Sequence, residues 1–319
     1  MKVTTDIRGL ARVTGPETEV FEFSSEQVPG RWKRNVLLLS SALRSQHLVI
    51  HFSLPEVMFF AIFLFLVPFN KCRITTLDLF VGDLPLWAMP FVRWCTNRVS
   101  RFLVYFRDTT ATSLRFHIPA ARFQYIPFKV NGYELIRATP TRDAGYIFSG
   151  GRSRRDFATF FAAVNSLGYP VKLVVGNESE LPANGSSLLG LKVPGNVELL
   201  NTNVNMEHFV NLLCGARLVV VPILRDSTTQ AGIGVYLQAM AAGKCLIISS
   251  GLGVNDVITD DQAMIVPAGD ADALREAIRR AWNDEVLRQR YAEAGMRFAL
   301  PLGGEDELRR SILRSLPAD

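Results

Sequence analysis

Residues 230–244 read QAGIGVYLQAMAAGK, and the apolar segment CLIISS follows at 245–250. Gly232 and Gly234 stand directly before a stretch with helical spacing, and Gly251 and Gly253 follow the apolar segment. A glycine turn ahead of a helix exposes unpaired backbone N–H groups and the positive end of the helix dipole, which together favour a phosphate group. This stretch therefore predicts a strand-and-helix domain with an anion site at one edge of its sheet.

The same alternation continues on both sides of this stretch. Runs rich in Val, Ile and Leu predict strands at 146–149, 171–175, 196–200, 217–222, 245–249 and 263–267. Segments with helical spacing predict helices at 156–167, 206–214, 234–242 and 270–283. Apolar strands that alternate with helices are typical of a parallel sheet covered on both faces. Such a doubly wound sheet binds ligands at the carboxyl ends of its strands.

The N-terminal half is less regular. Strands are expected at 19–23, 48–52, 73–77 and 102–105, whereas residues 1–16 show no convincing strand. The polar segment 137–143 contains Pro140 and is expected to separate two domains. We therefore expect a first domain at 1–140, a second at 141–298, and a final helix at 299–319 that packs back on the first.

Three segments of the C-terminal half resemble the donor-site signature of the family-four glycosyltransferases. They are LQAMAAGK at 237–244 with its preceding glycine turn, MIVPAGDADALREAI at 264–278, and FSGGRSRRDF at 148–157. The resemblance implies a GT-B fold, in which two Rossmann-like, doubly wound domains face a cleft. The donor is then bound by the C-terminal domain and the acceptor by the N-terminal one. Because no opening strand is recognised, the N-terminal domain is expected to be shortened.

The donor-binding residues are expected in the glycine-containing loops. Arg152 and Arg155 follow the loop at Gly150 and Gly151. A guanidinium group suits a diphosphate both as ligand and as stabiliser of leaving-group charge. Taken alone, the two arginines also fit the solvated start of a helix. The expected donor site consists of Gly151, Arg152, Arg155, Gln230, Gly232, Gly234 and Gln238.

Gln230 and Gln238 stand where the family usually has two glutamates. A glutamine can still hydrogen-bond a sugar or ribose hydroxyl through its amide. It supplies no negative charge to an oxocarbenium-like transition state, so the inverting or retaining outcome stays open.

A general base for the acceptor hydroxyl is expected at a strand end of the N-terminal domain. Asp78 follows the apolar segment RITTL, at a position where many relatives have a strand-end histidine. Asp83 and His51 are the reserve candidates. The alternatives are structural, since an aspartate at this position can cap a turn and a lone strand-end histidine is more often part of the framework.

The residues and the resemblance together imply a glycosyltransferase of the hexosyltransferase type. It is expected to move a sugar from a nucleotide diphosphate sugar, UDP-linked, to a polysaccharide or a lipid-linked glycan. No cofactor and no metal are expected, because arginines and backbone amides would bind the phosphates. Two alternatives stay open: a catalytically silent sugar-nucleotide-binding subunit, and a sugar-nucleotide epimerase of the same fold.

The charge is unevenly distributed along the chain. Residues 1–137 carry 17 Lys and Arg against 10 Asp and Glu, whereas the remainder carries 18 against 20. A basic N-terminal half indicates an anionic partner. Nucleic acid is not expected, because the basic residues are scattered and no nucleic-acid motif surrounds them.

The segment VMFFAIFLFLVPF at 57–69 is entirely apolar, yet too short to span a bilayer. It fits a buried core helix and a peripheral membrane contact equally well, the latter because Trp87, Trp94 and several arginines lie nearby. Four cysteines without metal-site spacing and the lack of an apolar core in residues 1–30 favour the cytoplasm or the cytoplasmic face of a membrane.

Overall fold

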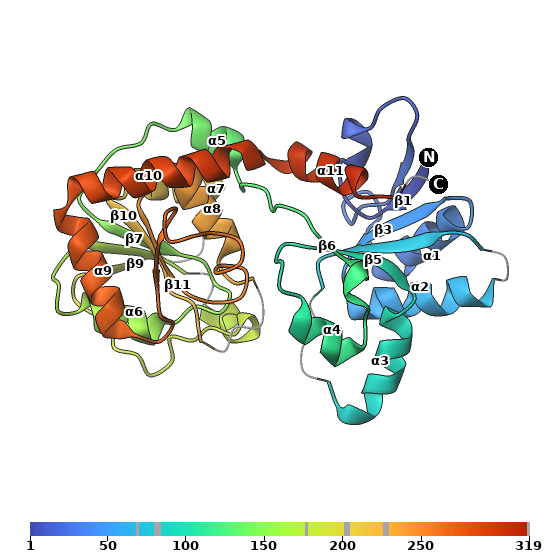
Figure 1. The fold of residues 1–319 in the computed structure, drawn as a ribbon, viewed down its shortest axis with the longest axis horizontal. Helices are drawn as coiled ribbons and strands as arrows, with labels where there is room; N and C mark the ends of the chain where they lie inside the picture. Colours follow the sequence, from blue (N-terminus) through green and yellow to red (C-terminus); the bar gives the residue numbers. More distant parts are fainter. Residues whose placement is uncertain (68–69, 80–83, 176–177, 201–204, 226–229, 318–319) are drawn as a thin grey trace. The chain divides into compact units, whose positions relative to one another are not determined.

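The computed structural model describes residues 1–67, 70–79, 84–175, 178–200, 205–225 and 230–317. Its internal contacts divide the chain into an N-terminal unit, formed by residues 1–127 and 306–319, and a C-terminal unit, formed by residues 128–305. The sequence placed this boundary at 140 instead. Each unit contains a six-stranded sheet whose neighbouring strands all run parallel (Figure 1).

In the C-terminal unit the strands are ordered β12-β11-β10-β7-β8-β9. The chain starts in the middle at β7, moves outward to β9, and then returns to the other side of β7 with β10. The strand order therefore reverses between β7 and β10, and this is where a doubly wound sheet leaves a crevice for a ligand. The strands predicted for this half are all confirmed. The elements are β7 (Ile147–Gly150), α6 (Phe157–Val164), β8 (Val171–Val174), β9 (Val197–Leu200), α7 (Met206–Gly215), β10 (Leu218–Val221), α8 (Ile233–Ala241), β11 (Leu246–Ser249), β12 (Met264–Val266), α9 (Ala271–Asn283) and α10 (Glu285–Ala299), with α5 (Tyr133–Ala138) ahead of β7.

In the N-terminal unit the strands are ordered β2-β1-β3-β4-β5-β6, and the order reverses between β1 and β3. Its last helix, α11, is held by Arg309 Nε, which donates to the Arg8 carbonyl at 2.8 Å. The elements are β1 (Lys2–Thr5), β2 (Glu19–Glu22), α1 (Arg31–Ala42), β3 (His47–His51), α2 (Leu54–Leu66), β4 (Arg73–Leu77), α3 (Met89–Thr96), β5 (Val99–Val104), α4 (Thr110–Phe116), β6 (Phe123–Tyr125) and α11 (Glu305–Arg314).

Strand β1 corrects the expectation that residues 1–16 hold no strand. It pairs with both β2 and β3, and Val3, Thr4 and Thr5 are buried. The sequence KVTT hides the strand because three of its four residues are polar. The Thr4 hydroxyl is satisfied inside the unit by the hydroxyls of Ser41 and Ser45, at 2.7 and 2.9 Å. The N-terminal sheet has as many strands as the C-terminal sheet. The N-terminal domain was expected to be shortened, but its sheet is not.

Helix α8 lies at the centre of the C-terminal unit and is buried along most of its length. Residues 235–241 are all buried, so the helix has no polar face. Tyr236 Oη donates to the Gly253 carbonyl at 3.0 Å, which ties the helix to the loop after β11. Lys244, just beyond the helix, donates to the carbonyls of Arg142 and Ala216, each at 2.7 Å. The motif lysine therefore joins the segment before β7 to the segment before β10.

Lys244 gives the C-terminal unit a pH-dependent stability. Burial lowers the pKa of Lys244 from 10.5 to about 8. Between these values the unfolded chain binds more protons, so the contribution of Lys244 to the free energy of unfolding increases with pH and is lost as the pH falls through 8. In urea unfolding, wild type should gain stability relative to Lys244→Met as the pH rises from 8 to 10.5. A difference that stays constant over this range would contradict the prediction.

Candidate functional site

Arg155 is a buried cation at the carboxyl edge of the C-terminal sheet. Arg155 is 3% exposed. Its Nε donates to the Gly150 carbonyl at 3.0 Å, and its Nη1 donates to the Ser153 carbonyl at 2.7 Å. Burial lowers the pKa of the guanidinium to about 10, which leaves it charged at neutral pH. Within the described ranges, no carboxylate forms an ion pair with it.

A buried charge is costly unless an opposite charge and hydrogen bonds compensate it. At Arg155 backbone carbonyls supply part of this compensation, but their dipoles carry no net charge. Gly150 is the last residue of β7, so the guanidinium lies at the point where the strand order reverses between β7 and β10. The location and the charge together fit an anionic ligand.

Gly151 leaves the space that this guanidinium occupies, and Gly232 lies beside it. Gly151 has a φ of 100°, and a Cβ at this position would overlap the Arg155 guanidinium. Gly232 has a φ of 88°, and a Cβ there would lie 3.0 Å from Val221 Cγ1 and 3.7 Å from Arg155 Nη1. Arg155 is therefore close to both glycine-containing segments that the sequence singled out.

Helix α8 begins at Gly232 without a capping side chain. Four other helices of the C-terminal unit are capped by a side-chain oxygen, supplied by Asp156, Asn205, Asp270 and Asp284. A helix N-terminus leaves several N–H groups without an intrahelical partner, and an uncapped one offers them to a ligand. The turn at Gly232 thus adds backbone donors beside the buried guanidinium.

The structure does not bring Arg152 to this position. Arg152 Nη1 lies 3.3 Å from Glu180 Oε2, and both side chains are more than half exposed. The contrast with Arg155 comes from the loop between them, in which Arg154 takes a left-handed conformation with a φ of 54° and its side chain packs over Gly185. A phosphate contact of Arg152 stays a prediction.

The remaining predicted donor residues lie around the start of α8. Gln230 is half-buried directly before the glycine turn, and its carbonyl accepts from the Ile233 amide at 3.4 Å. A Cβ at Gly234 would lie 2.8 Å from the Asn131 side-chain amide. Gln238 is buried, and its Nε2 donates to the Asn131 carbonyl at 3.1 Å. Gln238 thus holds the segment before α5, and its contact with a ribose or a sugar stays a prediction.

Two polar residues at this edge were missed by the sequence analysis. The Ser149 hydroxyl, on β7, is buried and has no hydrogen-bond partner among the described residues. Arg225 Nε, beyond β10, donates to the Ala268 carbonyl at 3.1 Å, beside Gly269. Only the strand-end position of Arg225 was visible in the sequence, and nothing distinguished Ser149 from its neighbours.

In the N-terminal unit, Asp78 lies at the carboxyl end of β4 in a left-handed conformation with a φ of 69°. Its carboxylate accepts a hydrogen bond from the Leu79 amide at 2.8 Å. Tyr105 lies beyond β5. Burial and the charge of nearby Asp78 both raise the pKa of the Tyr105 hydroxyl. Strained backbone of this kind concentrates at functional sites. Asp83 lies outside the described residues.

His51 and Asp6 form a second polar pair at the carboxyl edge of this sheet. Asp6 Oδ1 accepts from the His51 amide at 2.9 Å and lies 3.3 Å from His51 Nδ1. Asp6 follows β1 and His51 ends β3, so the pair lies where the strand order reverses. Asp6 was missed because β1 was missed. An aspartate at Nδ1 orients an imidazole so that Nε2 can accept a proton.

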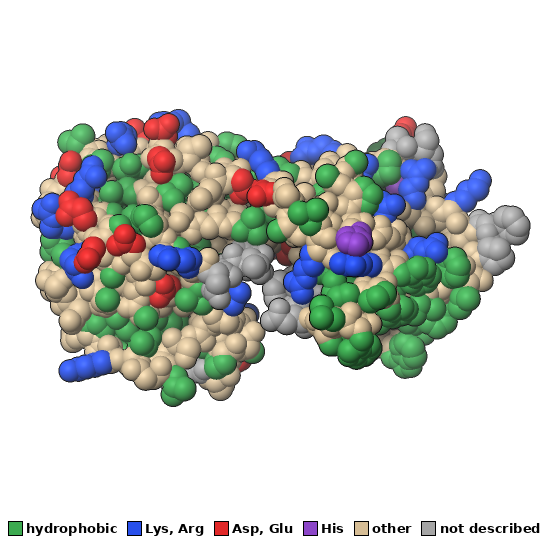
Figure 2. Space-filling model, turned by 60° about the horizontal axis from the view of Figure 1, so that its bottom comes forward, with side chains coloured by type: hydrophobic (Ala, Val, Ile, Leu, Met, Phe, Trp, Pro, Cys, Tyr) green, Lys and Arg blue, Asp and Glu red, His purple; other side chains and the backbone are tan. Residues whose placement is uncertain are grey.

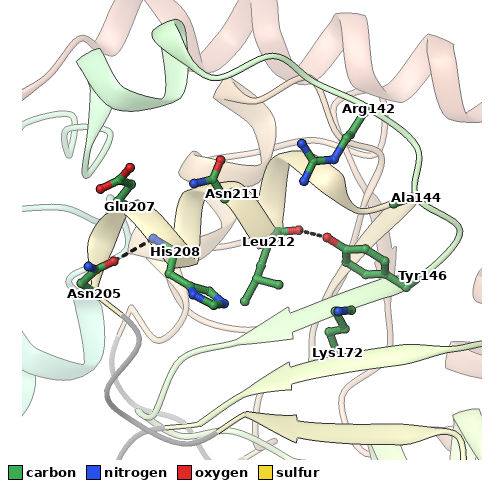
Figure 3. Close-up of a pocket in the computed structure, with 9 residues that line it drawn as sticks. All are labelled: Arg142, Ala144, Tyr146, Lys172, Asn205, Glu207, His208, Asn211 and Leu212. Carbon is green, nitrogen blue, oxygen red and sulfur yellow. Dashed lines mark hydrogen bonds between the residues drawn. The ribbon is translucent and has the colours of Figure 1, made fainter.

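A separate pocket of about 540 Å³ runs beside α7 (Figure 3). Tyr146 precedes β7 and Lys172 is the second residue of β8, so the pocket lies toward the amino ends of these strands. The Tyr146 hydroxyl donates to the Leu212 carbonyl at 2.6 Å. No predicted donor residue lines this pocket, whose lining residues are Arg142, Ala144, Tyr146, Lys172, Asn205, Glu207, His208, Asn211 and Leu212.

Residues 154–284, which include Arg155 and the whole of α8, match the family model of the group 1 glycosyl transferases. The matched segment lies within the C-terminal unit. No curated protein matches the sequence of the transferase.

Solved structures show that the transferase has the GT-B fold. A glycosyltransferase from Rickettsia africae superposes with a TM-score of 0.67 at 12% identity, over 98% of this chain and 97% of that one. HepE from Anabaena, solved with UDP and glucose, gives 0.70 at 12% identity over 99% of each chain. Sucrose-phosphate synthase from Thermosynechococcus elongatus gives 0.62 at 18% identity, over 94% of this chain and 84% of that one.

A Cβ at Gly151 would overlap the Arg155 guanidinium, so Gly151→Ala should lower the free energy of unfolding. Gly190 is a matched control, because its φ is 75° and a Cβ there would meet no described atom within 4 Å. Gly190→Ala should lose about 1–2 kcal/mol in free energy of unfolding, the usual cost of a left-handed non-glycine residue. Gly151→Ala should lose more in the same denaturant titration, because the guanidinium must also move. Equal losses would show that Arg155 does not occupy this space.

Proposed function

We propose that this glycosyltransferase moves a sugar from a nucleotide diphosphate sugar to a polysaccharide or a lipid-linked glycan. The observation that carries the proposal is the buried Arg155 charge, which lies between the two glycine loops without a carboxylate partner among the described residues. A diphosphate would supply the missing negative charge. The group 1 family match covers the same segment.

The proposed chemistry needs positive charge at the leaving group. When the bond between the sugar and the diphosphate breaks, negative charge develops on the diphosphate oxygen. The Arg155 guanidinium and the N–H groups at the start of α8 can stabilise that charge without reorganising, because both are fixed before the reaction. The proposal therefore needs no metal ion.

UDP is the nucleotide that the proposal favours. The structural neighbour HepE was solved with UDP, with UDP and glucose, and with UDP-glucose. The similarity to HepE is in the fold, so the nucleotide must be tested directly. Gln230 and Gln238 are the proposed partners of donor hydroxyls, through their amide groups.

Arg155→Met should weaken UDP binding and leave most of the fold intact. Methionine keeps an apolar stem of similar length and removes the charge. Loss of a charged hydrogen bond costs roughly 1.5–3 kcal/mol, which corresponds to a dissociation constant about 10–150-fold larger in calorimetric titration. Arg152→Met is the comparison, because Arg152 is exposed and pairs with Glu180, so its predicted phosphate contact should contribute less. If the Arg152 variant loses as much affinity as the Arg155 variant, the buried guanidinium has no special role.

The acceptor hydroxyl must lose a proton, and we propose that a group at the carboxyl edge of the N-terminal sheet takes it. Asp78 is the first candidate, since its backbone is strained at a strand end. His51 is the second, because its imidazole is 59% exposed and its Nδ1 faces Asp6. Asp83, which the sequence held in reserve, has no structural argument for or against it.

Asp78→Asn and His51→Gln should separate these two candidates. Each variant keeps the size of the side chain, and loss of the general base should lower turnover by about 10²–10⁴-fold with UDP affinity unchanged. Asp6→Asn should reproduce part of the His51→Gln effect only if His51 is the base. Near-normal turnover in both single variants would remove the base from this edge of the sheet.

Labelled UDP-sugar distinguishes the transferase from the two alternatives. Transfer to an acceptor, or slow hydrolysis of the donor without one, supports the transferase. A donor recovered with altered sugar configuration supports an epimerase, and binding without turnover supports a silent subunit.

A further inference from the structure

Three helices of the N-terminal unit, α1, α2 and α3, present a large apolar surface to solvent (Figure 2). Helix α1 packs on α2, and α2 packs on α3, so their exposed side chains lie on neighbouring elements. We call this surface the aromatic face. Its exposed members are Trp32, Val36, Phe63, Phe65, Leu66, Leu86, Trp87 and Phe91.

Helix α2 is only partly a core helix. Val57, Phe60 and Ala61 are buried against the sheet, whereas Phe65 is 54% exposed and Leu66 is 64% exposed. Leu86 and Trp87, in the short helical turn Leu86–Ala88, are 89% and 83% exposed. Side chains of this size are not left in water over several elements without a partner.

The aromatic rings of this face pack against one another. Phe65 contacts Trp94 at 5.4 Å between ring centroids, and Phe91 stacks on the same indole at 6.1 Å. On the α1 side, Trp32 contacts Phe59 at 5.4 Å. A hollow of about 600 Å³ opens beside Trp32, between α1 residues that include Arg31 and Lys33.

Positive charge is interleaved with these rings. Helices α1, α2 and α3 contain Arg31, Lys33, Arg34 and Arg93 but a single carboxylate, Glu56, which is paired with Arg31. The Arg98 guanidinium lies 4.3 Å from the centre of the Phe65 ring and 4.9 Å from that of Trp94. Aromatic side chains with basic residues among them suit the boundary between lipid headgroups and acyl chains.

We propose that the aromatic face docks the protein on the surface of an anionic lipid bilayer. In the described part of the chain no helix is both long and apolar enough to cross a membrane, so contact would be limited to the interface. A second copy of the chain fits less well, because a symmetric pairing of this face would place like charges against each other. The proposal does not rest on sugar transfer, since docking is measured without a donor.

Vesicle sedimentation tests this surface directly. The double variant Leu86→Ser with Trp87→Ser removes the two most exposed members of the face and should weaken binding to phosphatidylglycerol-containing vesicles about tenfold or more. Leu189→Ser with Val286→Ser is the matched control, because these residues are 92% and 81% exposed in the C-terminal unit. The control should bind as the wild type does. Circular dichroism confirms that both variants are folded.

The charge contribution has its own variant. Lys33→Glu with Arg34→Glu should weaken binding to anionic vesicles at low salt, with a smaller effect at high salt, where screening weakens surface charges. Arg290→Glu in the C-terminal unit should have no effect. Tryptophan fluorescence measures independently how deeply this face enters the bilayer. Three of the four tryptophans lie on or beside the face: Trp32, Trp87 and Trp94. Brominated lipids should quench their fluorescence.

Two results would overturn the proposal. In the first, the Leu86→Ser, Trp87→Ser variant binds vesicles as tightly as the wild type does, and brominated lipids do not quench the fluorescence of the wild type. The other is a wild-type dimer in analytical ultracentrifugation that this variant abolishes, together with no vesicle binding at low salt. The second result would assign the face to a second copy of the chain. If the wild-type protein binds vesicles but transfers no sugar, only the proposed function is contradicted.

Discussion

The carboxyl edge of the C-terminal sheet is organised around a buried positive charge, the Arg155 guanidinium. The Arg155 guanidinium is held by the carbonyls of Gly150 and Ser153, and the residue is 3% exposed. Its position requires that Gly151 carry no side chain, whereas a Cβ at Gly232 would crowd Val221 Cγ1 at 3.0 Å. Helix α8 begins close to the guanidinium, at Gly232, without a capping side chain. In the proposed function, the diphosphate of the donor supplies the negative charge that this site lacks among the described residues.

Both units place candidate polar residues where the strand order reverses, although Asp78 lies one strand farther along, after β4. In the C-terminal sheet this is the carboxyl edge between β7 and β10, with Arg155; in the N-terminal sheet it is the edge between β1 and β3, with Asp6 and His51. Loops from the two strands at such a point run in opposite directions and leave space between them. The same topology therefore supplies the proposed phosphate site in one unit and a candidate proton acceptor in the other.

The sequence predicted the C-terminal unit well because its strands are continuous apolar runs and its turns contain glycine. It failed at β1, where the buried Thr4 hydroxyl pairs with two serine hydroxyls and the buried Thr5 hydroxyl accepts from the Ile7 amide. Asp6 was missed with that strand. Arg152 and Arg155 looked equivalent in the sequence, since burial depends on how the loop folds. The run at 57–69 was ambiguous for a related reason: one side of α2 is in the core and the other is in solvent.

A crystal structure of the complex with UDP tests the central claim most directly. The account predicts a β-phosphate oxygen within about 2.7–2.9 Å of an Arg155 guanidinium nitrogen, the usual length of a charged hydrogen bond. The same diphosphate should accept a hydrogen bond from a backbone N–H in the first turn of α8. A diphosphate bound elsewhere on the C-terminal unit, with Arg155 still bonded only to the carbonyls of Gly150 and Ser153, would contradict the account.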